Sequence, residues 1–205
     1  MRHNSNSDKF YRIKDKCRYE EKIKDSRFIA TAVPVNEEKE ASSFISEIKK
    51  EFHDASHNCS AYRIGSGNKP IYRYNDDGEP SGTAGRPILK AIETRELSDI
   101  CVVVTRYFGG TKLGTGGLAR AYGQLATELL KKCEVEKKYE TRTVEFSVGF
   151  DFVGVIHNIL DKFKVDLKDS QYGDDVLFRV EVRSTAFAAF KENLIEATNG
   201  QVRFR

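Results

Sequence analysis

The last third of the chain shows the most regular pattern of hydrophobic and polar positions. Alternation with period two runs over 144–150 and 176–182, which is typical of strands with one buried face. Apolar residues at helical spacing follow each run, in 152–163 and 187–197. Short alternating segments at 165–167 and 202–204 complete the order β-α-β-β-α-β. This order predicts a ferredoxin-like domain.

The earlier part of the chain mixes strands and helices less regularly. Strands are predicted at 27–35 and 57–64, and the apolar run 100–105 predicts an interior strand. Helices are predicted at 37–52, from Pro87, and from Leu118 to about Lys132. The charged stretch 137–141 predicts a boundary between domains. The predicted class is α+β, with a polar arm at 1–17, a first domain at 18–138 and a ferredoxin-like domain at 139–205.

Composition and charge narrow the class of protein only slightly. The chain has 34 basic and 31 acidic residues, so its net charge of +3 permits an RNA or phosphate partner without requiring one. No apolar run approaches the roughly 20 residues that span a bilayer, and no secretory segment is evident. We therefore expect a cytoplasmic protein without a membrane partner. The cysteines form no C-x-x-C pair and no evident disulfide framework, so free, reduced thiols are expected at Cys17, Cys59, Cys101 and Cys133.

A glycine-rich run, RYFGGTKLGTGGLARAY at 106–122, lies between the predicted interior strand and the helix after it. Backbone N–H groups in such a loop converge at the positive end of a helix, which favours an anion. From Ile100 to Thr127 the chain has no Asp or Glu. The alternative is that the glycines only shape a tight connection. The candidate phosphate or nucleic-acid residues are Arg106, Gly109, Gly110, Lys112, Gly114, Gly116, Gly117 and Arg120.

Two nucleotide-binding motifs match this run only in part. Thr115 and Gly116 stand where a Walker loop requires Lys and Ser or Thr. Residues 114–119 satisfy G-x-G-x-x-A, but a single βαβ unit is too little for a dinucleotide-binding domain. His3, His53 and His157 have no metal-ligand spacing. No cofactor or metal is predicted.

An acidic loop, NDDGEP at 75–80, gives a second set of candidates. Its carboxylates suit a hard cation, but Asp-Asp-Gly is also ordinary turn chemistry. A Ser-His-Asp set can be drawn from Ser81, His57 and Asp77, although the context lacks the G-x-S-x-G elbow. The simpler alternatives are a strand histidine bonded to the loop and an ion-pair network with nearby arginines. These secondary candidates are His57, Asp77, Glu79, Ser81 and Arg86.

Four segments together resemble the YigZ/Impact family: SRFIA (26–30), HNCSAYRIG (57–65), YNDDGEPSGTAG (74–85) and RYFGGTKLG (106–114). The last 65 residues resemble the second domain of its bacterial branch, which is similar to a C-terminal domain of elongation factor G. The resemblance implies a ribosomal-S5-domain-2-like first domain and a link to translation. Eukaryotic Impact proteins restrain the kinase that phosphorylates initiation factor 2. They carry an N-terminal RWD domain that this sequence does not show, so we do not expect the kinase role here.

Together these features favour a non-enzymatic, translation-linked binding or regulatory factor that contacts RNA or ribosomal phosphate through the glycine loop. No RNP-type aromatic motif is present, so backbone contact is expected rather than base reading. One alternative is an enzyme acting on a phosphorylated or acyl small molecule between Asp77, Ser81 and the glycine loop. Another is a protein–protein module for a ribosome-associated partner. The sequence predicts no particular oligomeric state.

Overall fold

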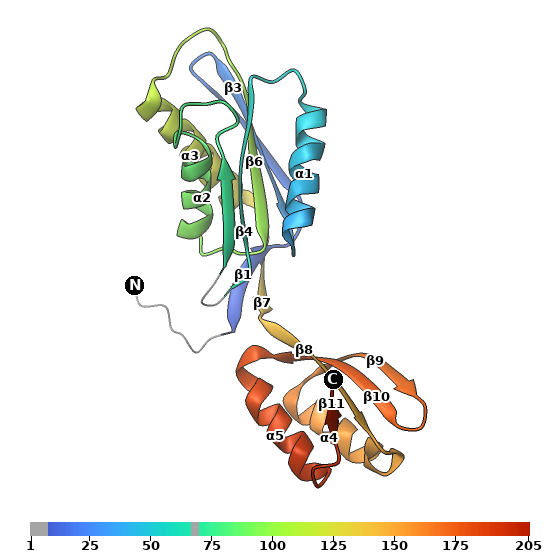
Figure 1. Cartoon of the computed structure of the whole chain (residues 1–205). Helices are drawn as coiled ribbons and strands as arrows, with labels where there is room; N and C mark the ends of the chain where they lie inside the picture. The colour runs from blue at the N-terminus through green and yellow to red at the C-terminus, as the bar shows by residue number, and fades with distance from the viewer. Residues whose placement is uncertain (1–7, 67–69) are drawn as a thin grey trace. The chain divides into compact units, whose positions relative to one another are not determined.

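The computed structural model describes residues 8–66 and 70–205, which form two compact units (Figure 1). The first unit contains residues 10–138, and the second contains 139–205 together with residues 8 and 9. Both units combine helices with antiparallel sheets, so the predicted α+β class is confirmed. Among the described residues, no helix is both long and apolar enough to cross a membrane.

A five-stranded antiparallel sheet forms the centre of the first unit, with the strand order β2-β3-β6-β4-β5. The central strand β6 is buried on both faces, as its continuous apolar run predicts. β2 and β5 form the two edges. The strands are β2 Cys17–Ile23, β3 Ser26–Pro34, β4 His57–Ile64, β5 Ile71–Asn75 and β6 Ile100–Tyr107.

Helices cover both faces of this sheet (Figure 1). On one face, α1 (Glu38–Glu51) buries a small core. On the other, α2 (Gly85–Thr94) and α3 (Thr115–Lys132) bury the main core. The rings of Phe28 and Tyr122 meet edge to face there, with centroids 5.4 Å apart, and this contact packs α3 onto the sheet.

Strand β1 (Lys9–Ile13) lies within the segment whose polar sequence predicted an arm. It pairs with β7 (Val135–Tyr139), and its Ile13 is fully buried in the main core.

The expectation that all four cysteines are free is wrong for Cys17 and Cys133. These two residues form a disulfide, with Cα atoms 6.0 Å apart and a sequence separation of 116. The fold alone brings them together, so their spacing along the chain gave no indication of the bond. Cys59 and Cys101 are free and buried.

The second unit has the predicted ferredoxin-like topology, with the antiparallel strand order β11-β8-β10-β9. Helices α4 and α5 pack together and cover the apolar face of the sheet. Short 3-10 turns at Phe150–Phe152 and Ser184–Ala186 lead into the two helices. The elements are β8 Thr141–Val148, α4 Val153–Phe163, β9 Asp166–Tyr172, β10 Val176–Arg183, α5 Phe187–Ala197 and β11 Arg203–Phe204.

The register predicted for β10 is confirmed. Val176, Phe178, Val180 and Val182 are each at most 1% exposed and all belong to the helix-covered core. Phe178 pairs with Phe146 of β8, and the stacked rings have centroids 5.4 Å apart. A shift of one residue would turn every one of these side chains to solvent.

We expect Phe178→Ala to destabilise the second unit by about 3–5 kcal/mol, because it removes a fully buried ring from a small core. Hydrogen exchange resolved by unit is the suitable measurement, since the two units need not unfold together. Protection should fall in β8 and β10 and stay unchanged in β6. The control Arg179→Ala, which removes an exposed partner of Glu145, should cost less than about 1 kcal/mol. Equal protection in the two variants would contradict the assigned register.

Candidate functional site

The glycine loop runs from Phe108 to Gly114 and connects β6 to α3. All three of its glycines have clear structural roles. A Cβ at Gly109 would overlap the backbone of Asp25, and Gly110 and Gly114 have φ values of +94° and +72°. These positions agree with the reading in which glycine shapes a tight connection.

Gly116 has no comparable structural role. It lies in the first turn of α3, is exposed, and has no atom within 4 Å of the position a Cβ would take. Glycine within a helix costs about 1 kcal/mol relative to alanine. The lack of a side chain instead leaves the backbone of the first turn accessible to a ligand.

The amino end of α3 also lacks a capping side chain. Its first helical hydrogen bond runs from the Leu118 N–H to the Gly114 carbonyl, at 2.9 Å. In the described part of the chain, the N–H groups of Thr115, Gly116 and Gly117 therefore have no acceptor. Together with the helix dipole, these free donors favour an anion.

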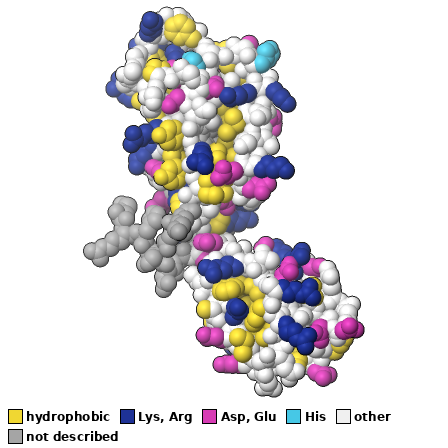
Figure 2. Space-filling model, viewed as in Figure 1, with side chains coloured by type: hydrophobic (Ala, Val, Ile, Leu, Met, Phe, Trp, Pro, Cys, Tyr) yellow, Lys and Arg dark blue, Asp and Glu magenta, His cyan; other side chains and the backbone are white. Residues whose placement is uncertain are grey.

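An open groove of about 460 Å³ lies beside this helix end. We call it the α3 groove. One side comes from the end of β2 and the turn after it, and the other from the glycine loop and the first turns of α3. Figure 2 shows Lys and Arg side chains at the upper end of the first unit, where Figure 1 places the loop before α3. The lining residues are Glu21, Lys22, Ile23, Lys24, Leu113, Gly117, Arg120, Ala121 and Gln124.

The cations of the α3 groove are exposed, and none has an acidic partner in the described part of the chain. Lys22, Lys24 and Arg120 line it, and Lys112 lies in the adjoining loop. Within residues 8–66 and 70–205, none of the four takes part in an ion pair. Sequence reasoning selected Lys112 and Arg120 but missed Lys22 and Lys24, because EEKIK at 20–24 looks like an ordinary exposed strand end.

The fold does bring two acidic residues close to the glycine loop, although the sequence has none between 100 and 127. Glu21 lines the α3 groove. The Asp25 carboxylate accepts a hydrogen bond of 2.6 Å from the Thr111 hydroxyl. The groove lining thus contains three cations and one carboxylate, and its local charge remains positive.

Arg106, another residue selected from the sequence, lies inside the first unit and not in the α3 groove. It is 5% exposed, and its Nη1 donates to the Glu79 carboxylate at 2.7 Å. Its guanidinium carbon lies 5.5 Å from the Phe28 ring centre and 5.4 Å from that of Phe108. The positive charge of Arg106 is therefore already balanced, and its main contacts hold the loop in place.

Glu79 connects this arginine to α3. Its carboxylate also accepts a 2.8 Å hydrogen bond from the Tyr122 hydroxyl. Burial, chiefly, raises the pKa of Tyr122, so the hydroxyl remains a donor. Glu79 thus joins the acidic loop, β6 and α3 in one buried network.

The neighbouring carboxylates of the acidic loop have structural partners as well. The Asp76 carboxylate accepts hydrogen bonds from the N–H groups of Gly82, Ala84 and Gly85, at 2.8, 3.0 and 2.8 Å, and so satisfies free donors at the amino end of α2. The Asp77 carboxylate binds the Lys49 ammonium and the Asn58 N–H, both at 2.6 Å. No group of three or more His, Cys, Asp or Glu suited to a metal occurs among the described residues.

Among the described residues, the remaining secondary candidates are not hydrogen-bonded to one another as a Ser-His-Asp set. His57 Nδ1 lies 2.8 Å from the Asp77 carbonyl, and its Nε2 lies 3.9 Å from Glu79. Ser81 and Arg86 are exposed, and no hydrogen bond joins Ser81 to His57 in the described chain. Burial raises the pKa of the Cys59 thiol to about 12, so this thiol is not an activated nucleophile. The contacts of His57 are those of a strand histidine bonded to a loop.

Fold and site together describe a two-domain α+β protein with an open basic groove beside a helix end. Its sequence matches the Impact N-terminal domain over residues 24–130 and a domain of unknown function, DUF1949, over 146–201. The chain belongs to the IMPACT family. It is 44% identical over 192 residues to the IMPACT family member YvyE of Bacillus subtilis, covering 94% of this chain and 88% of that protein. It is 31% identical over 184 residues to YigZ of Escherichia coli, covering 89% and 90%.

The similarity to eukaryotic members is shorter. Protein IMPACT of Bos taurus is 34% identical over 93 residues, which are 43% of this chain and 29% of the bovine protein. Among solved structures, one of a hypothetical protein has a TM-score of 0.73 and 29% identity, and the match covers 96% of both chains. The two-domain layout is therefore shared with a protein of known structure.

We expect Glu79→Leu and Arg106→Met each to lower the free energy of unfolding of the first unit by about 3–5 kcal/mol, because each leaves a buried charge without its partner. The double variant should lose clearly less than the sum, since it removes both charges. Native-state hydrogen exchange of the β6 amides measures this stability. Strictly additive losses would show that the two charges do not interact.

Proposed function

We propose that the chain is a translation-linked binding or regulatory factor that contacts phosphate groups of RNA or the ribosome. The contact surface is the α3 groove together with the glycine loop. We place the protein in the cytoplasm, and the proposed role requires no turnover. One observation carries the proposal: cations that form no ion pair with any described residue lie beside the uncapped end of α3 at Gly116.

The physical basis is neutralisation of phosphate charge. Cations that have no acidic partner are available to a polyanion, and binding releases the counterions of the nucleic acid. The N–H groups of Gly116 and Gly117 add directed donors for a single phosphate. Lys22, Lys24 and Arg120 lie along an open groove, which suits an extended backbone. These contacts recognise phosphate and sugar and do not read the base sequence.

The link to translation rests on the family. It comes from the resemblance to eukaryotic Impact proteins and, for the second domain, to part of elongation factor G. A ribosome-associated protein is the alternative partner for the same surface. The enzyme alternative has weaker support, because Glu79 and Arg106 are buried against each other and Cys59 stays protonated near neutral pH.

Replacing Lys112 and Arg120 with alanine tests the cations directly. We expect the double variant to bind a single-stranded uridine oligonucleotide more weakly, with a salt slope smaller by about 0.7 for each lost phosphate contact. The matched control is Lys39→Ala/Lys50→Ala, which removes two exposed cations of α1 on the opposite face of the sheet. Titrations at several salt concentrations measure both quantities. The same affinity and slope in a folded Lys112→Ala/Arg120→Ala protein would refute the site.

Gly116→Ala separates a binding role from a structural one. We expect it to stabilise α3 by up to about 1 kcal/mol, because the site is helical and has room for a methyl group. RNA affinity should nevertheless fall, since the methyl group blocks approach to the first-turn amides. The control is Gly154→Ala, at an equally open position in the first turn of α4. Unchanged RNA binding by Gly116→Ala would argue against the amides as ligands.

A further inference from the structure

We propose that the disulfide between Cys17 and Cys133 is a redox-sensitive clamp that sets the shape of the α3 groove. In the oxidised protein the clamp holds the groove as described above, and reduction releases it. The effect on RNA rests on the proposed function, whereas the change in the groove can be measured without any ligand.

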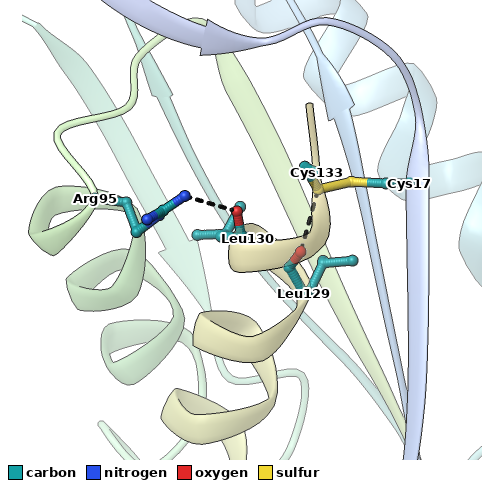
Figure 3. Close-up of a disulfide and its surroundings, with 5 residues drawn as sticks. All are labelled: Cys17, Arg95, Leu129, Leu130 and Cys133. Atoms are coloured by element: carbon teal, nitrogen blue, oxygen red, sulfur yellow. Dashed lines mark hydrogen bonds between the residues drawn. A yellow bond between two sulfur atoms is a disulfide. The ribbon is translucent and has the colours of Figure 1, made fainter. Parts of the chain in front are cut away.

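Figure 3 shows where the disulfide lies. Cys17 is the first residue of β2, and Cys133 directly follows the last residue of α3. The last turn of α3 is held on another side as well, because Arg95 Nη2 donates to the Leu130 carbonyl at 3.2 Å. The covalent bond therefore attaches the end of a well-packed helix to the start of a strand.

The same two elements form the α3 groove at their other ends. Ile23, the last residue of β2, and Gly117, in the first turn of α3, both line it. β2 and α3 thus run past each other in opposite directions, with the disulfide at one end and the groove at the other. No other pair of described cysteines joins two elements in this way.

Besides the disulfide, the contacts of α3 with β2 involve strand side chains that are only partly buried. The Lys132 ammonium lies 5.0 Å from the centre of the Tyr19 ring. Tyr19 and Ile23 are only partly buried against the main core. Among the described strands of the sheet, β2 pairs with β3 alone, so it is an edge strand. An ion pair between Arg18 and Glu51 attaches it to α1 on the other face of the sheet. Loss of the covalent bond would leave β2 with no strong attachment to α3, and it could shift relative to that helix.

The two cysteines differ in exposure, and this difference determines which sulfur a reductant attacks first. Cys17 is partly exposed, whereas Cys133 is 7% exposed. A thiolate of a small dithiol attacks the Cys17 sulfur, the bond between the two protein sulfurs breaks, and Cys133 leaves as a thiolate that takes up a proton. The second thiol of the reagent then displaces Cys17, so the reagent becomes a cyclic disulfide. Two electrons and two protons pass to the protein.

The reverse reaction uses a low-molecular-weight disulfide as oxidant, which is released as two thiols. In the reduced protein, the Cys133 thiol can donate to the Leu129 carbonyl, which lies 3.3 Å from its sulfur. Cys59 and Cys101 do not compete, because burial raises the pKa of each thiol to about 12. In a reducing compartment such a bond forms transiently and reports oxidation.

Two measurements on the full chain test the clamp. The first compares amide exchange of oxidised and dithiol-reduced protein, with thiol alkylation to establish the state of Cys17 and Cys133. We expect faster exchange at 17–23 and 115–121 after reduction and little change in β10. The second measures binding of the uridine oligonucleotide, which should weaken about fivefold or more on reduction, the lower range of ordinary coupling between sites.

The control is Cys17→Ser/Cys133→Ser, which should behave like the reduced protein and be insensitive to the dithiol. Full alkylation of Cys17 in protein treated with the oxidant would overturn the proposal, as would unchanged exchange at 17–23 and 115–121 on reduction. Altered exchange without any RNA binding in either state would support the clamp and refute the proposed function. Altered exchange with equal RNA binding would refute control of binding by the clamp.

Discussion

The buried ion pair between Glu79 and Arg106 is the interaction on which the geometry of the site depends. Glu79 comes from the acidic loop, Arg106 from the end of β6, and Tyr122 from α3 binds the same carboxylate. Arg106 Nη2 also lies 3.3 Å from the Ser26 hydroxyl, where β3 begins. The segments on either side of the glycine loop therefore share one polar centre. A buried pair of this kind adds little net stability compared with apolar side chains, but it strongly disfavours arrangements in which either charge lacks its partner.

This centre explains why neighbouring glycines have different roles. Just after Arg106 the chain must pass against the backbone of Asp25, and only a glycine fits at position 109. The turn into α3 then requires the positive φ of Gly114. Gly116 is under neither constraint, although glycine weakens the first turn of a helix. A residue that reduces stability without helping the fold is most simply explained by access to the backbone it exposes.

Periodicity predicted the parts of this structure that depend on one sharply amphipathic face. Phe178 and Val180 follow strict alternation, so the register of β10 and the topology of its domain could be read from the sequence. The sequence could not show which group Arg106 binds, because an arginine at a strand end suits a phosphate or a buried carboxylate. The partner it has in the fold is Glu79, 27 residues away. The sequence also could not predict that Lys24 lines the same groove as Arg120, or that Cys17 binds Cys133. Such pairs follow from the packing of distant elements and leave no local pattern.

Helix α3 links all of these features. Its amino end borders the α3 groove, its middle binds the buried pair through Tyr122, and its carboxyl end is followed by the disulfide. Hydrogen bonds along a helix make it move largely as one body, so a constraint at one end restricts the other. Tyr122 and the fully buried Leu125 hold the middle of α3 against the sheet. The last turn is fixed as well, because Leu129 and Leu130 are fully buried. Release of the disulfide therefore leaves α3 in place and frees the edge strand β2 to shift against it. The end of β2 carries Lys22 and Ile23, which connects the covalent state of the disulfide to the site proposed for phosphate.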